Sequence, residues 1–273
     1  MEIKVLGPLM AESGGTSVVP SAGKPRQILA LLSLYANQVM PVPTLMEEIW
    51  GSDMPRSAPT TLQTYILQLR RLIAGALGPD GPRTAREVLA TRHGGYLLEV
   101  PPGAVDVHAY DRLVAAARGA AERGDDERAA ALYREALGVW RGPALVDVRL
   151  GPLLEIELVR LEESRLGVLE QRIDSDLRLG RHRQLLAELA SLTARHPLHE
   201  GLHAQCIVAL YRSGRRWQAL DAFQNLRRGL ADELGLDPSV RLQQLHRAVL
   251  AGDPALDSHL AGRRPVLDLF AAA

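Results

Sequence analysis

The chain has 273 residues, 47% of them hydrophobic and 23% charged, and these proportions are typical of a folded protein with room for two domains. Basic and acidic residues cancel at 32 each, so the net charge argues neither for nor against a nucleic-acid partner. A single cysteine, Cys206, excludes an intramolecular disulfide, and its apolar neighbours predict a small buried side chain. No signal-peptide pattern occurs, and no run approaches the ~18 apolar residues of a membrane span. The sequence therefore predicts a soluble cytoplasmic protein with no membrane partner.

Residues 1–100 alternate strand and helix signals. Short strands are expected at 3–6, 9–12 and 16–19. Helices are expected at 26–36, at 44–50 and, after Ser57 as the N-cap, from 58 onward. Pro41 and Pro43 are interpreted as breaks in the chain between the first two helices.

The third predicted helix has two faces of different chemistry. Its apolar face is formed by Leu62, Tyr65, Ile66, Leu69, Leu72 and Ile73. At about 100° per residue, the opposite face carries Thr60, Thr64, Leu67 and Arg71, flanked by Thr61, Gln63, Gln68 and Arg70. A hairpin is expected next, with strands at 88–91 and 96–100 and a turn at 92–95. A sheet, three helices and a hairpin in this order are typical of an OmpR-type winged helix-turn-helix, in which the hairpin is the wing.

Beyond the breaker sequence at 100–103, the chain shows nearly continuous helical periodicity. The expected helices cover 107–123, 125–140, 153–179, 182–195, 199–213, 216–234 and 238–250. The segments around Gly180 and Gly214 resemble each other at a spacing of 34 residues, the period of tetratricopeptide (TPR) repeats. The predicted fold class is an α+β winged helix-turn-helix head followed by an all-α TPR-like helical-repeat domain. The predicted boundaries are 1–100 for the head, 104–250 for the helical domain and 251–273 for a tail.

The third helix and the hairpin offer the chemistry of duplex recognition. In the major groove glutamine pairs with adenine, arginine with guanine, and a threonine methyl contacts that of thymine. Residues around the helix starts are candidates for phosphate contacts, and Arg92 at the wing tip can enter a minor groove. Residue types do not decide which pairing forms, whether Arg70 or Arg71 contacts a base, or whether the face is merely solvated. The candidate DNA-binding residues are Lys24, Arg26, Arg56, Thr60, Thr61, Gln63, Thr64, Gln68, Arg70, Arg71, Arg92, His93 and Gly94.

Local charge supports this interpretation modestly. Residues 54–95 hold six basic and two acidic residues, a net charge of +4 in a chain that is neutral as a whole. A basic surface of this kind attracts the phosphate backbone regardless of base sequence. It is compatible with nucleic-acid binding by the third helix and wing, while the arginine pairs 215–216 and 227–228 of the helical domain are expected to be solvated and leave contact with nucleic acid or polymerase as an alternative.

Ordered motifs along the chain resemble the Streptomyces antibiotic regulatory protein family. In the head they are KPRQILALL at 24–32, IWG at 49–51, SAPTTLQTYI at 57–66 and GYL at 95–97. In the helical domain they are VWRGPAL at 139–145, HPL at 196–198 and ELGLDP at 233–238, which resemble the family's bacterial transcriptional activation domain. The resemblance runs over residues 1–250.

This resemblance implies a transcriptional activator that binds tandem direct repeats of double-stranded DNA near the −35 region of antibiotic biosynthetic promoters. A second protomer would lie head to tail with the first on one face of the DNA. The pair would recruit RNA polymerase through its sigma factor and core subunits. No P-loop pattern occurs, so we expect a minimal member without a fused ATPase and without a cofactor.

Other functions are less compatible with the sequence. The chain has no nucleophile elbow, no HExxH and no phosphate-binding glycine loop, which argues against an enzyme. The alternative is a helical-repeat scaffold for proteins whose head binds DNA non-specifically. His196, His199 and His203 have a spacing that could suit a metal, but a proline after His196 interrupts the helix and favours a structural role. Trp217 lies in a helical apolar pattern and is expected to pack.

Overall fold

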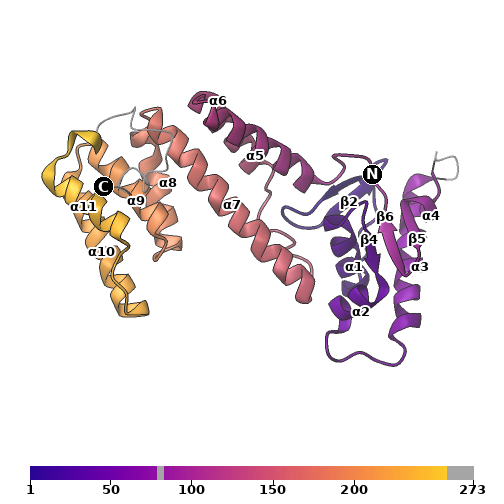
Figure 1. Cartoon of the computed structure of the whole chain (residues 1–273). Helices are drawn as coiled ribbons and strands as arrows, with labels where there is room; N and C mark the ends of the chain where they lie inside the picture. Colours follow the sequence, from indigo (N-terminus) through magenta and orange to yellow (C-terminus); the bar gives the residue numbers. More distant parts are fainter. Residues whose placement is uncertain (79–82, 257–273) are drawn as a thin grey trace. The chain divides into compact units, whose positions relative to one another are not determined.

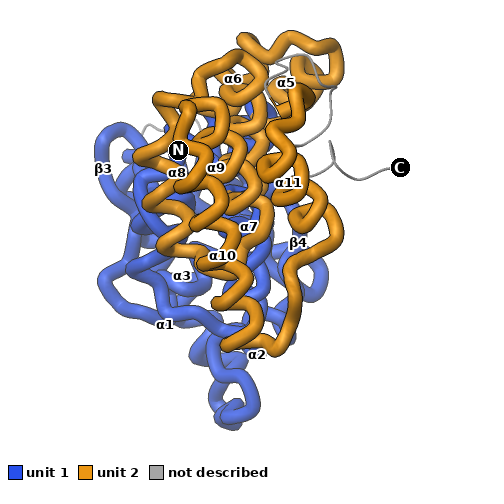
Figure 2. The backbone as a smooth tube through the Cα atoms, turned by 90° about the vertical axis from the view of Figure 1, so that its left-hand side faces the viewer, with its two compact units in different colours: residues 1–113, 136–165 blue, residues 114–135, 166–273 orange. Residues whose placement is uncertain are grey.

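The computed structural model describes residues 1–78 and 83–256 (Figure 1). The predicted tail at 251–273 therefore lies mostly outside the described residues. The chain forms two compact units, one of residues 1–113 with 136–165 and the other of residues 114–135 with the chain from 166 onward (Figure 2). Helices α5 (Asp106–Glu122), α6 (Asp126–Gly138) and α7 (Pro152–Arg178) each contribute residues to both units. Over the described ranges, no helix is both long enough and apolar enough to cross a membrane.

The head consists of small antiparallel sheets and short helices. Its elements are β1 (Glu2–Lys4), β2 (Met10–Ser13), β3 (Thr16–Ser17), α1 (Gly23–Leu34), β4 (Val39–Pro41), α2 (Val42–Trp50), α3 (Ala58–Leu77), α4 (Ala85–Val88), β5 (Leu89–Arg92) and β6 (Gly95–Leu98). The first sheet has the order β1-β2-β3 and the second the order β4-β6-β5. Sheet, helices and terminal hairpin follow one another as predicted, so the winged helix-turn-helix is confirmed.

Strand β4 is not evident from the sequence, because Pro41 and Pro43 favour a break. In the structure Pro41 is the last residue of β4, an edge strand, opposite Gly95 of β6. A proline is tolerated at a sheet edge because its missing N–H interrupts no ladder on the open side. The close pairing requires glycine at 95, since a Cβ there would lie 2.3 Å from the Met40 carbonyl oxygen. The wing turn is also shorter than predicted, because Arg92 already pairs with Gly95.

Helix α3 buries the predicted apolar face. The most buried members are Leu62, Ile66, Leu69 and Ile73, each at most 2% exposed. Ser57 precedes the helix as predicted, but its side chain forms no capping hydrogen bond. Its backbone oxygen instead accepts from the Thr61 amide at 2.9 Å. The opposite, polar face of α3 therefore remains turned to solvent.

Asp106 and residues 136–165 pack against the head and supply hydrogen-bond partners to the backbone that follows its first strand. The Asp106 carboxylate accepts from the amides of Val5 and Leu6 at 2.9 and 3.1 Å. The Asp147 carboxylate accepts from the amide of Leu9 at 2.7 Å. Val5 and Leu6 are fully buried, so these amides have no access to solvent and need partners of this kind.

A buried carboxylate in α2 caps the first turn of α7. Glu48 is 2% exposed and accepts from the amides of Gly151, Leu153 and Leu154 at 2.8, 2.8 and 3.2 Å. Gln27 donates to the same carboxylate at 2.9 Å. The first amides of a helix lack partners within it, and a negative charge there interacts favourably with the helix dipole. The head and α7 are thus joined by charge-assisted hydrogen bonds.

The second unit is helical throughout its described part. Beyond α5 its elements are α6 (Asp126–Gly138), α7, α8 (His182–Arg195), α9 (Glu200–Arg212), α10 (Arg216–Leu234), α11 (Val240–Ala251) and a 3₁₀ turn at Pro254–Leu256. Helix α9 packs against α8, α10 and α11. The core between them includes Leu185, Leu189, Ile207, Phe223, Leu226 and Leu245. Every helix end predicted between 107 and 250 agrees with the structure within two residues. Gly180 and Gly214 adopt left-handed conformations in the turns after α7 and α9, which suits the ends of those helices.

Candidate nucleic-acid interface

The exposed face of α3 carries polar side chains around Leu67, which is 47% exposed. Thr60, Gln63, Thr64 and Arg71 are exposed on the same side of the helix. Among the described residues, Gln63 and Arg71 form no hydrogen bond or ion pair within the chain. Their donors and acceptors are therefore available to a ligand. Thr61 and Gln68 are half-buried and lie at the margins of this face.

Arg70 points away from this face and joins α3 to the wing. Its Nε and Nη2 donate to the Leu89 carbonyl oxygen at 2.9 and 2.8 Å, and Nη2 also donates to Thr91 Oγ1 at 2.8 Å. The guanidinium lies 6.0 Å from the centre of the Tyr96 ring. Burial lowers the pKa of Arg70 from its ordinary value. Arg70 and Arg71 are equivalent as candidates in the sequence, but they have different surroundings in the structure.

The tip of the wing is formed by exposed residues. Arg92, His93 and Gly94 are all exposed, and Gly94 has a φ of 75°, which favours glycine in the turn. Nη2 of Arg92 lies 3.5 Å from Oε2 of Glu99 at the base of the wing, so part of its charge is balanced within the protein. The tip therefore presents Arg92 and His93 to solvent on a tight turn.

The remaining candidates lie at the starts of helices. Arg56 is exposed just before α3. Lys24 Nζ lies 5.0 Å from the centre of the Trp50 ring. Arg26, expected at a phosphate, is instead bound within the protein: its Nη1 lies 3.1 Å from Oδ2 of Asp147, and its Nε donates to the Pro20 carbonyl at 3.1 Å. Its charge is thereby largely neutralised by the segment that packs against the head.

Outside the head, the candidate metal ligands and Trp217 have structural surroundings in the described residues. In the ranges that the structure describes, no group of His, Cys, Asp and Glu residues is arranged to hold a metal ion. His199 accepts from the Leu202 amide at 3.3 Å and so caps α9. Trp217 does not pack as expected, because it stands in the first turn of α10 with 72% of its surface exposed. Helical periodicity predicts the apolar pattern around Trp217 but cannot reveal that this side chain is left uncovered.

Comparison with known proteins identifies both parts of the chain. Residues 16–98 match the family "Transcriptional regulatory protein, C terminal", and residues 105–250 match the "Bacterial transcriptional activator domain". The regulatory protein DnrI of Streptomyces peucetius is 56% identical over 94% of each chain. The regulatory protein AfsR of Streptomyces coelicolor is 39% identical over 92% of this chain, which spans 24% of AfsR.

A solved structure of a relative shares the fold over nearly the whole chain. Mycobacterium tuberculosis EmbR, in complex with a low-affinity phosphopeptide, superposes with a TM-score of 0.87 and 31% identity, over 99% of this chain and 69% of EmbR. The relatives are named transcriptional regulators rather than enzymes. With an OmpR-type head, an activator domain and close similarity to DnrI over its length, the chain is a transcriptional activator that belongs to the Streptomyces antibiotic regulatory protein family.

Proposed function

We propose that this activator binds tandem direct repeats of double-stranded DNA overlapping the −35 region of antibiotic biosynthetic promoters and recruits RNA polymerase there, including its sigma factor. The observation that carries the proposal is the exposed face of α3, where Gln63 and Arg71 have polar groups without partners in the described chain. These side chains match adenine and guanine edges, and the threonine methyls match thymine, in a groove wide enough for a helix.

The other candidates have different roles in this proposal. Arg56 and Lys24 contact phosphates, which positions α3 without reading bases. Arg92, His93 and Gly94 place the wing tip at an adjacent minor groove or its backbone. Arg26 and Arg70 support the interface from within, because Asp147 and the wing strand already occupy their guanidinium groups.

Direct repeats require two protomers with the same orientation. If both α3 helices enter the major groove from one side of the duplex, the repeat spacing is close to a multiple of ~10.5 bp, one helical turn. Polymerase bound beside the −35 region would then meet the same surface of each protomer. The proposal thus links repeat spacing to polymerase recruitment.

DNase I footprinting on the promoters that neighbour the gene tests the proposal, with and without RNA polymerase. We expect protection of two direct repeats, and we expect RNA polymerase to strengthen it. The protection should be retained when ~10 bp, about one helical turn, is inserted between the repeats, and it should be weakened by an insertion of ~5 bp, half a turn. Equal protection of promoter and random DNA would instead favour a helical scaffold with a non-specific head. No protection at low salt would exclude the DNA-binding role of α3.

A further inference from the structure

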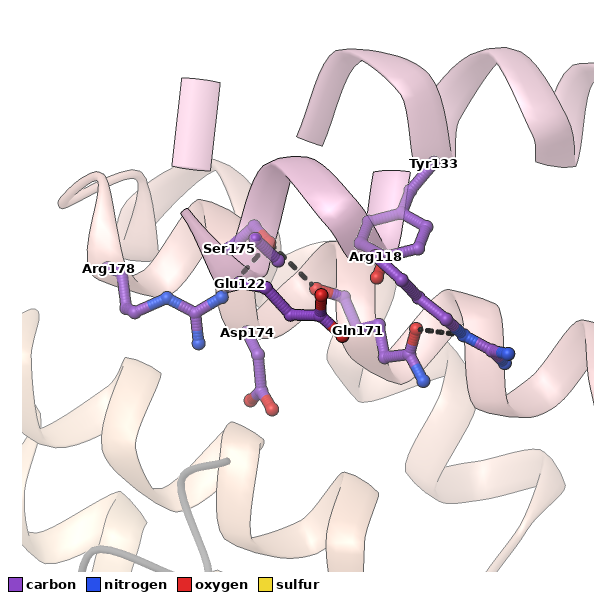
Figure 3. Close-up of a pocket in the computed structure, with 8 residues that line it drawn as sticks. Arg118, Glu122, Tyr133, Gln171, Asp174, Ser175 and Arg178 are labelled. Carbon is purple, nitrogen blue, oxygen red and sulfur yellow. Dashed lines mark hydrogen bonds between the residues drawn. The ribbon is translucent and has the colours of Figure 1, made fainter. Parts of the chain in front are cut away.

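A cavity of about 500 Å³ opens within the second unit, between α5, α6 and α7 (Figure 3). Its volume falls in the range of about 300–1,000 Å³ that is usual for small-molecule sites. It lies on the helical domain and shares no residue with α3 or the wing. The polar groups in its walls indicate what kind of molecule it can hold.

The inner wall presents Tyr133, whose ring is buried while its hydroxyl opens to the cavity. Tyr133 is 2% exposed, and within the described residues its hydroxyl forms no hydrogen bond. In Figure 3 this hydroxyl points toward the space beside Arg118 and Glu122. Burial raises the pKa of Tyr133, while the charges of Arg118 and Arg178 lower it and those of Glu122 and Asp174 raise it. The hydroxyl has no partner among the described residues, so a polar ligand atom that enters the cavity can bond to it.

Four charged side chains line the cavity around Tyr133: Arg118, Glu122, Asp174 and Arg178. Two of them already form hydrogen bonds within the protein. Arg178 Nε donates to Asp126 at 2.7 Å, and Asp174 accepts from Gln205 Nε2 at 2.8 Å. These groups shape the wall, and their charges are partly compensated by those neighbours. The other two charged residues, Arg118 and Glu122 on α5, are more available to a ligand.

Arg118 and Glu122 are exposed and lie one helical turn apart on α5. Despite this spacing they form no ion pair with each other, and Glu122 has none with any described residue. The described contact of Arg118 is a long hydrogen bond of 3.5 Å from its Nε to Gln171. A cation and an anion thus stand side by side at the mouth of one cavity without neutralising each other.

We propose that this cavity binds a small zwitterionic molecule of the amino-acid or dipeptide type. Its carboxylate would pair with Arg118, its ammonium group with Glu122, and an uncharged polar atom would bond to the Tyr133 hydroxyl. A guanidinium suits a carboxylate because it offers two parallel donors. A molecule with one charge only would leave either Arg118 or Glu122 without its partner. The proposal concerns the helical domain and does not depend on how α3 binds DNA.

Saturation-transfer NMR on the full chain tests the site, with the twenty L-amino acids, glycylglycine and glycyl-leucine as probes at millimolar concentration. Calorimetry then compares the tightest probe with its N-acetylated and C-amidated forms, and each loss of charge is expected to raise Kd about tenfold or more. Tyr133→Phe, Glu122→Gln and Arg118→Gln should each weaken binding of the intact probe. Arg128→Gln and Glu135→Gln, exposed changes on α6 outside the cavity, are matched controls that should leave Kd unchanged.

Some outcomes would overturn the proposal. If no zwitterionic probe shows transfer, or if the N-acetylated and amidated forms bind as tightly as the parent, the cavity does not select a zwitterion. Unchanged binding by the Tyr133→Phe and Glu122→Gln variants, each shown by thermal unfolding to be folded, would place the bound probe elsewhere. A loss of binding in the cavity variants, with the two controls unaffected, would support the assignment.

Discussion

Arg70 and Arg71 are adjacent in sequence, yet their guanidinium groups lie in different surroundings. Arg71 is exposed and has no partner in the described chain, whereas Arg70 donates to the wing strand. Arg71→Ala should therefore cost about 1–3 kcal/mol of binding free energy at the operator and relax preference at one base pair. Fluorescence anisotropy with the operator and with single-base variants measures both effects. An unchanged operator affinity would mean that the base-reading face of α3 lies elsewhere.

The buried thiol of Cys206 predicts a pH dependence of stability. Cys206 is 8% exposed, and burial raises its pKa from 9.0 to about 11. Between these values the unfolded chain ionises the thiol while the folded chain keeps it protonated. The contribution of Cys206 is therefore fully present below pH 9 and decreases by at most about 3 kcal/mol as the pH rises to 11.

Urea unfolding of the wild type and of Cys206→Ala from pH 7 to pH 11 isolates this effect. The variant loses buried volume at every pH but lacks the titrating group. We expect the stability difference between the two proteins to shrink as the pH passes 9. A difference that stays constant up to pH 11 would show that the folded thiol ionises as readily as the unfolded one.

For single residues, helical periodicity predicts which side chains share a face but not which contacts they make. The polar side of α3 follows from local spacing alone, so it is predictable from the sequence. The engagement of Arg26 by Asp147 joins residues 121 positions apart, and no local pattern indicates it. The exposure of Trp217 likewise depends on which helices surround α10.

At the scale of elements, Arg70 fixes the wing to α3. Arg70→Ala removes its three hydrogen bonds to Leu89 and Thr91, so we expect faster amide exchange over 89–98 with α3 itself little changed. Hydrogen exchange with mass spectrometry measures this. Arg71→Ala is the matched control, because it shortens the neighbouring arginine without touching the wing. Equal exchange of the wing in both variants would assign Arg70 no positioning role.

Glu48 should stabilise the junction between α2 and α7. Glu48→Ala leaves the amides of Gly151, Leu153 and Leu154 without their buried acceptor, so we expect a loss of about 2–4 kcal/mol in the free energy of unfolding. Glu48→Gln keeps one acceptor oxygen and should lose less. Glu47→Ala is the control, because Glu47 is exposed on the same helix. Equal stability of the Glu47 and Glu48 variants in urea unfolding would contradict the capping role.

The elements themselves are predicted well where their signals are local. The helices from α5 to α11 follow from apolar spacing and from glycines at their ends. Strand β4 is missed because proline has the same local preference at a sheet edge as in a loop, and only pairing with β6 distinguishes the two. The cap supplied by Glu48 is missed for a related reason, since its partners lie at least 103 residues away.

For the whole molecule, the family matches and the compact units divide the chain differently. The matched families meet between residues 98 and 105. The compact unit around the head nevertheless includes residues 136–165. The contacts explain this inclusion: Asp147 accepts from the Leu9 amide, and the first turn of α7 provides amides that donate to Glu48. The boundary between the matched families marks where one sequence family ends and the next begins. The boundary of the compact unit depends instead on which segments supply hydrogen-bond partners to the backbone and carboxylates of the head.

This difference predicts how fragments behave. A fragment of residues 1–101 lacks the carboxylates that accept from the amides of Val5, Leu6 and Leu9, so we expect it to be about 3–5 kcal/mol less stable than a fragment of residues 1–165. Amide exchange over residues 3–9 should be fast in the shorter fragment and slow in both the longer fragment and the full chain. If residues 3–9 are equally protected in all three, the head is complete at residue 101. Fast exchange in the shorter fragment alone would show that part of the activator domain belongs to the folded DNA-binding unit.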